Sequence, residues 1–489
     1  MNGPGVGDRF SPARQPGPPD LPGPPDLVVA GAGGGLAGAI RAAELGLRVL
    51  AVEASPHFEH GNNTSMSTSM IPGAGTRWQR QVGVEDSPDT FFADIVHKTE
   101  GSADPVAARA LAEVSARLVT WLADHVGLPV ELATDFGYPG HRVLRCHTVP
   151  GRTGTILLRG LLDAAGRQGQ LDLLVPARLT GVQAAAPGGV TAAVVTYPDG
   201  TEEAIPCRSV LLATNGFGAD PDMVRRHIPE IAGAVYHGSA ESRGDAVRIA
   251  AGLGAELAFM DAYQGHAALA TPHACLVGWA TVMHGGVLVN GSGRRFGNET
   301  QGYSEYAREV LAQPGSTAVL VFDRSVRDAC LVFDDFRQSV ASGALRWADD
   351  VASLAAAFDL PADSLAATMS AARAHADAGT TDETGRSHWE HPLEPPFAGV
   401  RVTAALFHTQ GGPRVDDHAR VLRPDGTPIP GLYASGGAAA GISGHGAAGY
   451  LAGNGLLPAL GLAFLAAEHA AEAAGRPAPL PLAGEGGAT

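Results

Sequence analysis

The chain has 489 residues, of which 45% are hydrophobic and 17% are charged, and its formal net charge at pH 7 is -16. This length exceeds the size at which a single core stops growing, so we expect a globular protein of two or three domains. The excess of acidic side chains argues against nucleic acid and anionic membranes as partners, because both attract clustered Lys and Arg, and it favours small-molecule ligands.

The cysteines favour a reducing compartment. They are far apart and show no CxxC spacing, which argues against a zinc site, a disulfide framework or an attached c-type haem. The four are Cys146, Cys207, Cys275 and Cys330. We therefore expect a cytoplasmic protein without a bound metal.

The ends of the chain predict neither a targeting segment nor a membrane span. Residues 1–25 are rich in Pro and Gly and lack an apolar signal core, so we expect a disordered tail there and a flexible tail at 476–489. The longest apolar stretch, Leu456 to Ala467, is too short to cross a bilayer and has the pattern of a buried helix.

The first predicted element is a strand at 27–30, followed by a glycine-rich turn, a helix at 36–45 and a second strand at 48–52. Glu53 ends the second strand, 22 residues after Gly31. Such a unit binds a dinucleotide: glycines let the backbone approach the pyrophosphate, the helix N-terminus attracts it, and the acidic side chain accepts hydrogen bonds from ribose.

The glycine turn departs from the usual GxGxxG spacing. Gly31 and Gly33 match, with Gly34 and Gly35 beside them, but Leu36 stands where the third glycine is expected, so the turn is one residue short. The surrounding strand, helix and acid still favour a dinucleotide site over a glycine-rich turn without a ligand.

Two later segments have the character of further cofactor contacts. A polar run occupies 61–69, and an apolar strand at 209–214 ends in small residues, Asn215 to Gly218, which suit a second close approach of the backbone. The middle of the chain differs: a hairpin is predicted at 286–296, followed by amphipathic helices of mixed charge. We therefore expect an inserted second domain.

The end of the chain returns to the character of the first domain. Gly431 to Gly437 leads into a glycine-rich loop, and a helix is predicted to begin at Asn454. A helix N-terminus at this position suits an extended cofactor with two polar ends.

Together these segments resemble the flavoprotein family of fumarate reductase and succinate dehydrogenase, which also contains the 3-ketosteroid dehydrogenases and urocanate reductases. The likeness covers roughly residues 26–473. Besides the opening dinucleotide unit, it depends on the ATNGFG segment at 213–218, LVNGSGRRF-x-NE at 288–299, His408 to Gly412, and PGLYASGG at 430–437 leading to Gly453-Asn454.

The resemblance implies an α/β fold with a doubly wound, Rossmann-like FAD-binding domain built from both chain ends, 26–260 and 409–475. An α+β capping domain is inserted at 261–408, with substrate between the two. FAD is noncovalent, because Asn63 stands where succinate dehydrogenases tether it through histidine. The implied cofactor-binding residues are Gly31, Gly33, Gly34, Gly35, Glu53, Asn63, Thr64, Ser65, Ala213, Thr214, Asn215, Gly216, Ser435, Gly436, Asn454 and Leu456.

Two tyrosines stand where fumarate reductases carry arginines, namely Tyr303 and Tyr450. A guanidinium binds a carboxylate bidentately and stays charged, so without two of them burying a dicarboxylate would cost on the order of several kcal/mol. A neutral carbonyl compound fits better, because a phenol can donate to a ketone oxygen and act as a general acid.

In the 3-ketosteroid dehydrogenases a tyrosine follows Asn-Glu at the spacing of Tyr303 and is catalytic. Gly446 matches the amide of their oxyanion site, but Ile442 stands where their second tyrosine belongs. Tyr450, His408 or His445 could supply that donor. The alternative is that these tyrosines only pack or line a pocket.

Two histidines resemble the substrate histidines of soluble fumarate reductases. His266 lies in Gln264-Gly265-His266, which resembles their Gln-x-His motif, and His408 resembles the second histidine. An ordinary buried histidine is the alternative in both cases.

The predicted function is an FAD-dependent oxidoreductase that moves hydride between the flavin and a CH–CH bond next to a carbonyl. It would desaturate a ketone, as 3-ketosteroid dehydrogenases do, or reduce an enone. Two alternatives stay open: a fumarate- or urocanate-type enoate reductase, and a flavin-binding isomerase or hydratase without redox chemistry. No haem or Fe–S motif is present, so the electron acceptor or donor is external.

Overall fold

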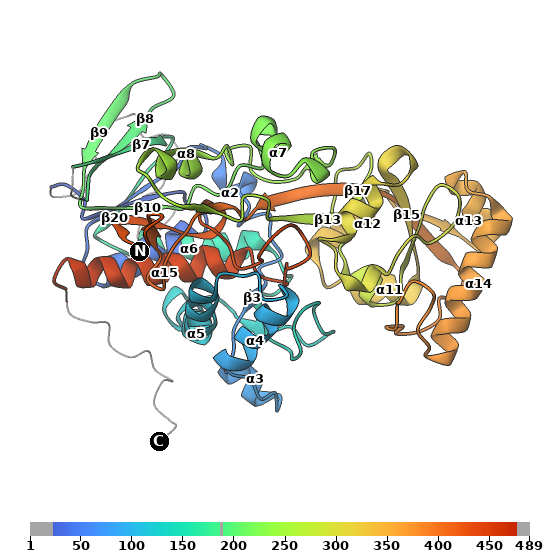
Figure 1. The fold of residues 1–489 in the computed structure, drawn as a ribbon. Helices are drawn as coiled ribbons and strands as arrows, with labels where there is room; N and C mark the ends of the chain where they lie inside the picture. Colours follow the sequence, from blue (N-terminus) through green and yellow to red (C-terminus); the bar gives the residue numbers. More distant parts are fainter. Residues whose placement is uncertain (1–22, 186–188, 477–489) are drawn as a thin grey trace, which may run out of the picture. The chain divides into compact units, whose positions relative to one another are not determined.

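The computed structural model describes residues 23–185 and 189–476, which form two compact units (Figure 1). The first combines the described residues up to His227 with Gly238–Ala262 and the segment from His408 onward. The second combines Ile228–His237 and Tyr263–Phe407. Most of the two predicted tails lies outside the described residues.

A six-stranded sheet in the order β19-β20-β10-β1-β2-β6 forms the centre of the first unit. Five neighbouring strands are parallel, and β19 is antiparallel at the edge. Strands β1, β2 and β10 are apolar and buried along their whole length, as parallel strands covered on both faces must be. The strands are β1 (Leu27–Ala30), β2 (Val49–Val52), β6 (Leu171–Leu174), β10 (Ser209–Leu212), β19 (Arg420–Leu422) and β20 (Pro428–Ala434).

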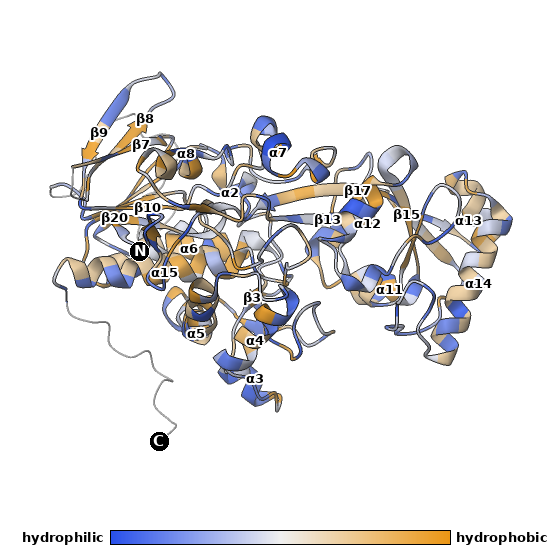
Figure 2. Ribbon diagram, in the orientation of Figure 1, coloured by the Kyte–Doolittle hydropathy of each residue, from blue (hydrophilic) through white to orange (hydrophobic). Residues whose placement is uncertain are grey.

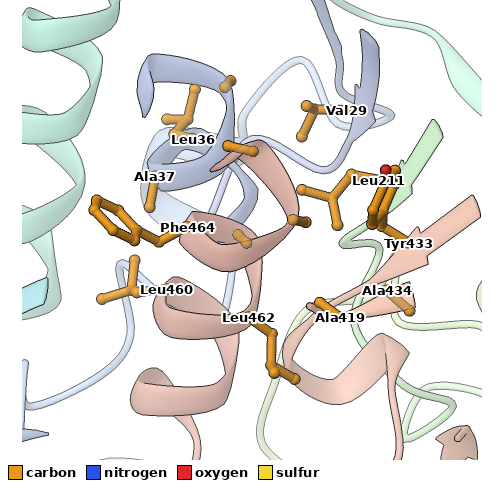
Figure 3. Packing of buried hydrophobic residues seen from close by; sticks show 14 of the residues in the cluster. Val29, Leu36, Ala37, Leu211, Ala419, Tyr433, Ala434, Leu460, Leu462 and Phe464 are labelled. Carbon is orange, nitrogen blue, oxygen red and sulfur yellow. The ribbon is translucent and has the colours of Figure 1, made fainter. Parts of the chain in front are cut away.

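Helices α1 (Gly35–Glu44) and α15 (Leu456–Ala473) pack closely together in this unit. A Cβ on Gly38 of α1 would lie 2.7 Å from the Ala463 carbonyl oxygen, so the lack of a side chain lets the two backbones approach. Phe464 of α15 lies beside Ala37 of α1 (Figure 3). The two chain ends are therefore joined in one core.

Among the described residues, α15 is the one helix long and apolar enough to cross a membrane by length and composition. In the present fold 67% of it is buried, which is the behaviour of a core helix. The hydropathy colouring shows its neighbouring strands β10 and β20 as hydrophobic, whereas α7 (Pro221–His227) is hydrophilic (Figure 2).

The other elements of the first unit surround this core. Its further helices are α2 (Phe58–Gly61), α3 (Arg77–Gln81), α4 (Pro88–Lys98), α5 (Pro105–Trp121), α6 (Gly154–Gly166) and α8 (Asp245–Gly252). Its three small sheets are formed by β3 (Ile71–Pro72), β5 (Cys146–Thr148) and β4 (Glu131–Leu132), by β7 (Arg178–Ala184), β8 (Val190–Thr196) and β9 (Glu202–Pro206), and by β12 (Leu257–Ala258) and β18 (Gly412–Pro413).

The second unit is an α+β unit built on a sheet in the order β11-β17-β15-β14, with β13 and β16 also paired to β17. The strands are β11 (Val235–Tyr236), β13 (Tyr263–Ala270), β14 (Val287–Val289), β15 (Thr317–Asp323), β16 (Arg346–Ala348) and β17 (Phe397–Thr409). The helices are α9 (Ala280–Met283), α10 (Tyr306–Leu311), α11 (Arg324–Cys330), α12 (Asp334–Ala341), α13 (Val351–Phe358) and α14 (Ala362–Ala378). The expected fold class is confirmed.

Two sequence-based expectations about this unit are wrong. The predicted hairpin at 286–296 has only one strand, β14, which pairs with β15, while Arg295 turns into buried ion pairs with Glu299 and Asp382. Residues 228–237 belong to the second unit, because β11 pairs with β17, although the predicted boundary assigned them to the first domain.

Candidate active site

The glycine turn after β1 is tightly packed. Gly31 has a φ of 113°, and a Cβ there would lie 2.3 Å from the Ala213 carbonyl oxygen, so only glycine fits. A Cβ on Gly33 would lie 2.8 Å from Thr64 Oγ1, and one on Gly34 would lie 2.7 Å from the Cβ of Ala459. The turn therefore brings three distant segments against one backbone.

Gly35 explains how the shortened turn works. A Cβ on Gly35 would lie 2.8 Å from the Ala213 Cβ and 3.0 Å from Val29 Cγ1. Close packing of helix on strand is the role of the third glycine in GxGxxG, and here Gly35 fills it one position early. Leu36 is consequently buried in the core, next to Ala37 (Figure 3).

Glu53 is held against the same turn. Its carboxylate accepts hydrogen bonds from the backbone N–H of Ala32 at 2.9 Å and of Ser55 at 2.8 Å. Burial raises the pKa of Glu53, although these backbone donors oppose the change. A carboxylate has lone pairs beyond the two used here, so it can still accept from ribose hydroxyls.

The carboxyl ends of three neighbouring strands meet at this edge of the sheet. Ala213 N–H donates to the Ala30 carbonyl at 2.9 Å, and Ser435 N–H donates to the Leu212 carbonyl at 2.9 Å. Gly436 follows in the left-handed region with a φ of 59°. Ligands of doubly wound sheets bind at such an edge.

Asn215 and Gly216 continue from β10. Asn215 has a φ of 64°, and its side chain accepts from Gly216 N–H at 2.9 Å and donates to Ser242 Oγ at 2.9 Å. A Cβ on Gly216 would lie 2.0 Å from Thr409 Oγ1, so the segment passes directly against the end of β17. Asn215 therefore shapes the loop through its own hydrogen bonds.

The polar run after α2 lies at the glycine turn as well. Asn63 Oδ1 accepts from Ser239 N–H at 2.7 Å, and Asn62 Oδ1 accepts from Ser65 N–H at 2.8 Å. A Cβ on Gly154 would lie 1.9 Å from the Thr64 carbonyl oxygen, so the run is pressed against α6. The side chain of Asn63 is thus committed to the backbone near Ser239.

Several buried polar atoms in the first unit have no hydrogen-bond partner among the described residues. Leaving such an atom unpaired costs about 1–3 kcal/mol, so those that lie in or beside segments expected to bind the cofactor indicate a polar ligand. These atoms are Thr214 Oγ1, Ser435 Oγ, Asn454 Oδ1, Asn62 Nδ2, Gln410 Oε1 and Gln410 Nε2, while Ser69 Oγ, His147 Nδ1 and His408 Nε2 are unpaired elsewhere in the same unit.

Asn62 and Gln410 were missed by the sequence analysis. Asn62 precedes Asn63 in the polar run, and Gln410 follows Thr409 in the His408 to Gly412 motif, so both were adjacent to recognised positions. Their residue types do not distinguish them from ordinary polar residues. They are distinguished only by buried side-chain atoms that lack a hydrogen-bond partner among the described residues.

Asn454 and Leu456 mark the start of α15, which begins at Leu456 and not at Asn454. Asn454 Nδ2 donates to Ser443 Oγ at 3.2 Å. A Cβ on Gly453 would lie 2.3 Å from Pro72 Cδ, so this loop is fixed against β3. The first turn of α15 thereby presents its backbone N–H groups at a defined place.

In the second unit, Tyr303 stacks on His266. The ring centroids are 5.0 Å apart with an interplanar angle of 26°, and Phe407 stacks on His266 at 5.1 Å. Ala268 N–H donates to His266 Nδ1 at 3.1 Å, so the ring proton is on Nε2. Burial lowers the pKa of His266 to about 3, and His266 is therefore a neutral donor.

The loop that carries Tyr303 is anchored by buried charges. Asn298 caps the short helix Glu299–Gln301 by accepting from Thr300 N–H at 3.0 Å. Glu299 is fully buried and forms ion pairs with Arg295 at 2.6 Å and with Arg386 at 3.3 Å. This network fixes the backbone just before Tyr303.

His408 and Tyr450 lie together in the first unit, with ring centroids 6.0 Å apart. A Cβ on Gly455 would lie 2.9 Å from His408 Nε2 and 3.5 Å from the Tyr450 hydroxyl oxygen. The His408 Nδ1 donates weakly to the Thr409 carbonyl at 3.4 Å, which leaves a lone pair on Nε2. Burial lowers the pKa of His408 to about 4.

The loop of Gly446 is open. Gly446 has a φ of 63°, and a Cβ built there would meet nothing within 4 Å. The neighbouring His445 is exposed and pairs with Asp261 at 2.9 Å, whereas Ile442 is buried in the core. Of the three candidate donors, Tyr450 and His408 are thus together, and His445 is engaged with a surface carboxylate.

Residues 26–456 match the family model for the FAD binding domain, and the chain therefore belongs to this family. FAD is its cofactor, as the sequence predicted.

The chain is similar to oxidoreductases of known activity. It is 28% identical to a fumarate reductase (cytochrome) of Shewanella frigidimarina, over 91% of this chain and 77% of that protein. It is also 28% identical to an NADH:fumarate oxidoreductase of Klebsiella pneumoniae, over 86% of this chain, but it spans only 45% of that protein's length.

A solved structure links the chain to the steroid branch. The 3-ketosteroid Δ4-(5α)-dehydrogenase of Rhodococcus jostii, in complex with 4-androstene-3,17-dione, is similar with a TM-score of 0.70 and 26% identity, over 92% of this chain and 98% of that chain. The chain is an FAD-dependent oxidoreductase of the fumarate reductase and 3-ketosteroid dehydrogenase type. The predicted family is confirmed.

Buried histidines predict how stability depends on pH. Burial is the largest cause that lowers the pKa of His141, His147 and His408 to about 4 and of His266 to about 3, against an ordinary 6.5. Below pH 6.5 the unfolded chain binds more protons, so stability is full above this pH and is lost as the pH falls toward 4, by up to about 1.4 kcal/mol per histidine and pH unit.

Urea unfolding at pH 7.5, 6 and 5 measures this loss. Replacing His147 with glutamine should flatten the dependence, whereas the same change at exposed His57 should not. An unfolding midpoint that stays constant or rises between pH 7.5 and 5 would contradict the prediction.

Proposed function

We propose that the enzyme transfers hydride between FAD and a CH–CH bond next to a neutral carbonyl group, in ketone desaturation or in the reverse reduction of an enone. The observation that carries this proposal is the neutrality of the candidate substrate residues. Tyr303 and Tyr450 replace two arginines, and burial keeps His266 and His408 uncharged at neutral pH. The two phenols and His266 can donate hydrogen bonds, but none of the four residues offers a dicarboxylate a compensating charge.

The residues proposed to hold FAD are those at the carboxyl edge of the first sheet. The amides of the turn from Gly31 to Gly35 and of α1 bind the pyrophosphate, and Glu53 accepts from ribose. The unpaired atoms of Thr214, Ser435, Asn454 and Asn62 supply further hydrogen bonds. Bound there, FAD supplies a two-electron acceptor or donor.

Each catalytic residue has a proposed role. Desaturation removes a proton from the carbon beside the carbonyl and a hydride from the next carbon. We assign the proton to Tyr303, whose ring is positioned by His266. The Tyr450 hydroxyl and the Gly446 N–H donate to the carbonyl oxygen and stabilise the negative charge that develops there.

A second candidate is reduction of a carboxylate-bearing enoate. It is favoured by the similarity to fumarate reductase, which extends over 91% of this chain. In that case other basic residues would bind the carboxylates. The electron donor or acceptor is external in both cases.

One anaerobic experiment separates these functions. Saturated cyclic ketones and steroids are added to the oxidised enzyme, and cyclic enones or fumarate to the reduced enzyme, while the flavin absorbance is followed. We expect bleaching by a ketone, or reoxidation by an enone, and no response to fumarate. Rapid reoxidation by fumarate would favour the second candidate, and no response to any compound would favour non-redox chemistry.

A further inference from the structure

The side-chain amide of Gln410 is buried, with 3% of the residue exposed, and its two polar atoms lack a partner within the described ranges. Its backbone is fixed on both sides. Gln410 N–H donates to the Ala262 carbonyl at 2.8 Å, and the Gln410 carbonyl accepts from Gly441 N–H at 2.8 Å. Gly441 also leaves room for the amide, because a Cβ there would lie 3.1 Å from Gln410 Oε1.

Gln410 follows a residue that is wedged between two proposed FAD segments. Thr409 Oγ1 accepts from Phe217 N–H at 3.0 Å, next to Gly216. The Cβ position of Gly437 lies 3.2 Å from the Thr409 carbonyl oxygen. The segments that follow β10 and β20 therefore both contact Thr409, the residue before Gln410.

A carboxamide offers an acceptor and a donor side by side, so full pairing requires a partner with a donor next to an acceptor. A ketone oxygen would pair with Nε2 only and leave Oε1 unsatisfied. The flavin ring of FAD carries an N–H at N3 between two carbonyl groups, which matches both atoms. Adenine also offers a donor beside an acceptor, but the glycine turn between β1 and α1 and Glu53 directly after β2 are the proposed contacts of that half of FAD.

We infer that the Gln410 amide binds the pyrimidine edge of the flavin, with Oε1 accepting from N3–H and Nε2 donating to a neighbouring flavin carbonyl. The hydrogen bond to the carbonyl stabilises the negative charge that the ring gains on reduction. Gln410 therefore contributes both to FAD affinity and to a higher flavin potential. This inference holds for any substrate of the enzyme.

The test compares FAD with FAD methylated at N3, which lacks the N–H donor. Dissociation constants are measured by flavin fluorescence for the full-length protein and for Gln410→Leu, a change of similar volume. The unaltered protein should bind FAD about tenfold more tightly than the methylated form, and Gln410→Leu should bind both equally. Gln183→Leu, at an exposed glutamine of β7, is the control and should keep the full preference.

Two further measurements keep the test decisive. The midpoint potential of bound FAD should fall in Gln410→Leu and in Gln410→Met. In the FAD-free protein, either change should leave the melting temperature equal or higher, because it removes buried unpaired atoms. Equal binding of both cofactors by the unaltered protein, or an intact preference in Gln410→Leu, would overturn the inference and would point to the adenine edge or to no contact with FAD.

Discussion

Replacing Tyr303 with phenylalanine is expected to lower kcat by about 10²–10⁴-fold while FAD stays bound, because the change removes only the hydroxyl that is proposed to move the proton. The stacking of the ring on His266 and its edge contact with Trp279 persist in phenylalanine. Packing is thus conserved, and the fall in kcat comes from the missing proton transfer. Anaerobic stopped-flow measurement of flavin reduction by a responsive ketone gives the rate directly.

Tyr306, three residues later in the same segment, is the matched control. It is buried, and its hydroxyl has no hydrogen-bond partner in the part of the chain that the structure describes. Tyr306→Phe should therefore keep normal turnover and normal or slightly higher stability. Full activity in Tyr303→Phe would eliminate Tyr303 as the proton-transfer residue.

Replacing Arg145 with methionine is expected to destabilise the protein by about 3–5 kcal/mol, because it leaves buried carboxylates without their counter-charge. Arg145 is fully buried and donates to Asp86 at 2.8 Å and to Asp94 at 2.7 Å. Burial by itself would raise the pKa of Asp94, but hydrogen bonds from Arg145 and Arg142 outweigh it and lower the pKa.

Arg142→Met provides the comparison. Arg142 pairs with the same Asp94, but 55% of its side chain is exposed, so its removal should cost less than about 1 kcal/mol. Urea unfolding at pH 7 measures both variants. Equal and small losses would show that Arg145 does not balance these charges, whereas adding Asp86→Asn and Asp94→Asn to Arg145→Met should recover most of the stability.

This buried cluster also reaches the segment before Asn454 that is proposed to bind FAD. Arg145 donates to His141 Nδ1 at 3.1 Å, which places the ring proton on Nε2, and Nε2 donates to the Ala452 carbonyl at 2.9 Å. Ala452 lies two residues before Asn454. Weakened FAD binding should therefore accompany the loss of stability in Arg145→Met.

The first strand, the glycine turn and Glu53 could be predicted from sequence because their geometry is local. A left-handed glycine and an acid after the second strand depend on residues within one short unit, and the hydrogen bond from Ala32 to Glu53 joins the two parts of it. The missing glycine was the exception. Gly35 provides the close packing of helix on strand instead, because Ala213 lies against that position. Ala213 is remote in sequence, so this contact could not be predicted.

The hairpin and the domain boundary failed for a related reason. Strand β14 pairs with β15, and β11 pairs with β17, so both pairings depend on residues far along the chain. Alternating apolar residues indicate a strand, but they do not predict which other strand it pairs with.

The sequence by itself determined the FAD-binding family, because the motifs occur over most of the chain and each one reflects a conformation that the local backbone must adopt. It also predicted that Tyr303 and Tyr450 stand where fumarate reductases carry arginines, a prediction from residue identity that needs no structure. The tertiary structure alone decided which polar side-chain atoms are left unpaired, as for both atoms of the Gln410 amide and Nδ2 of Asn62, and which histidines are held neutral. Burial and hydrogen-bond partners are properties of the packed chain, and they arise only when distant segments meet.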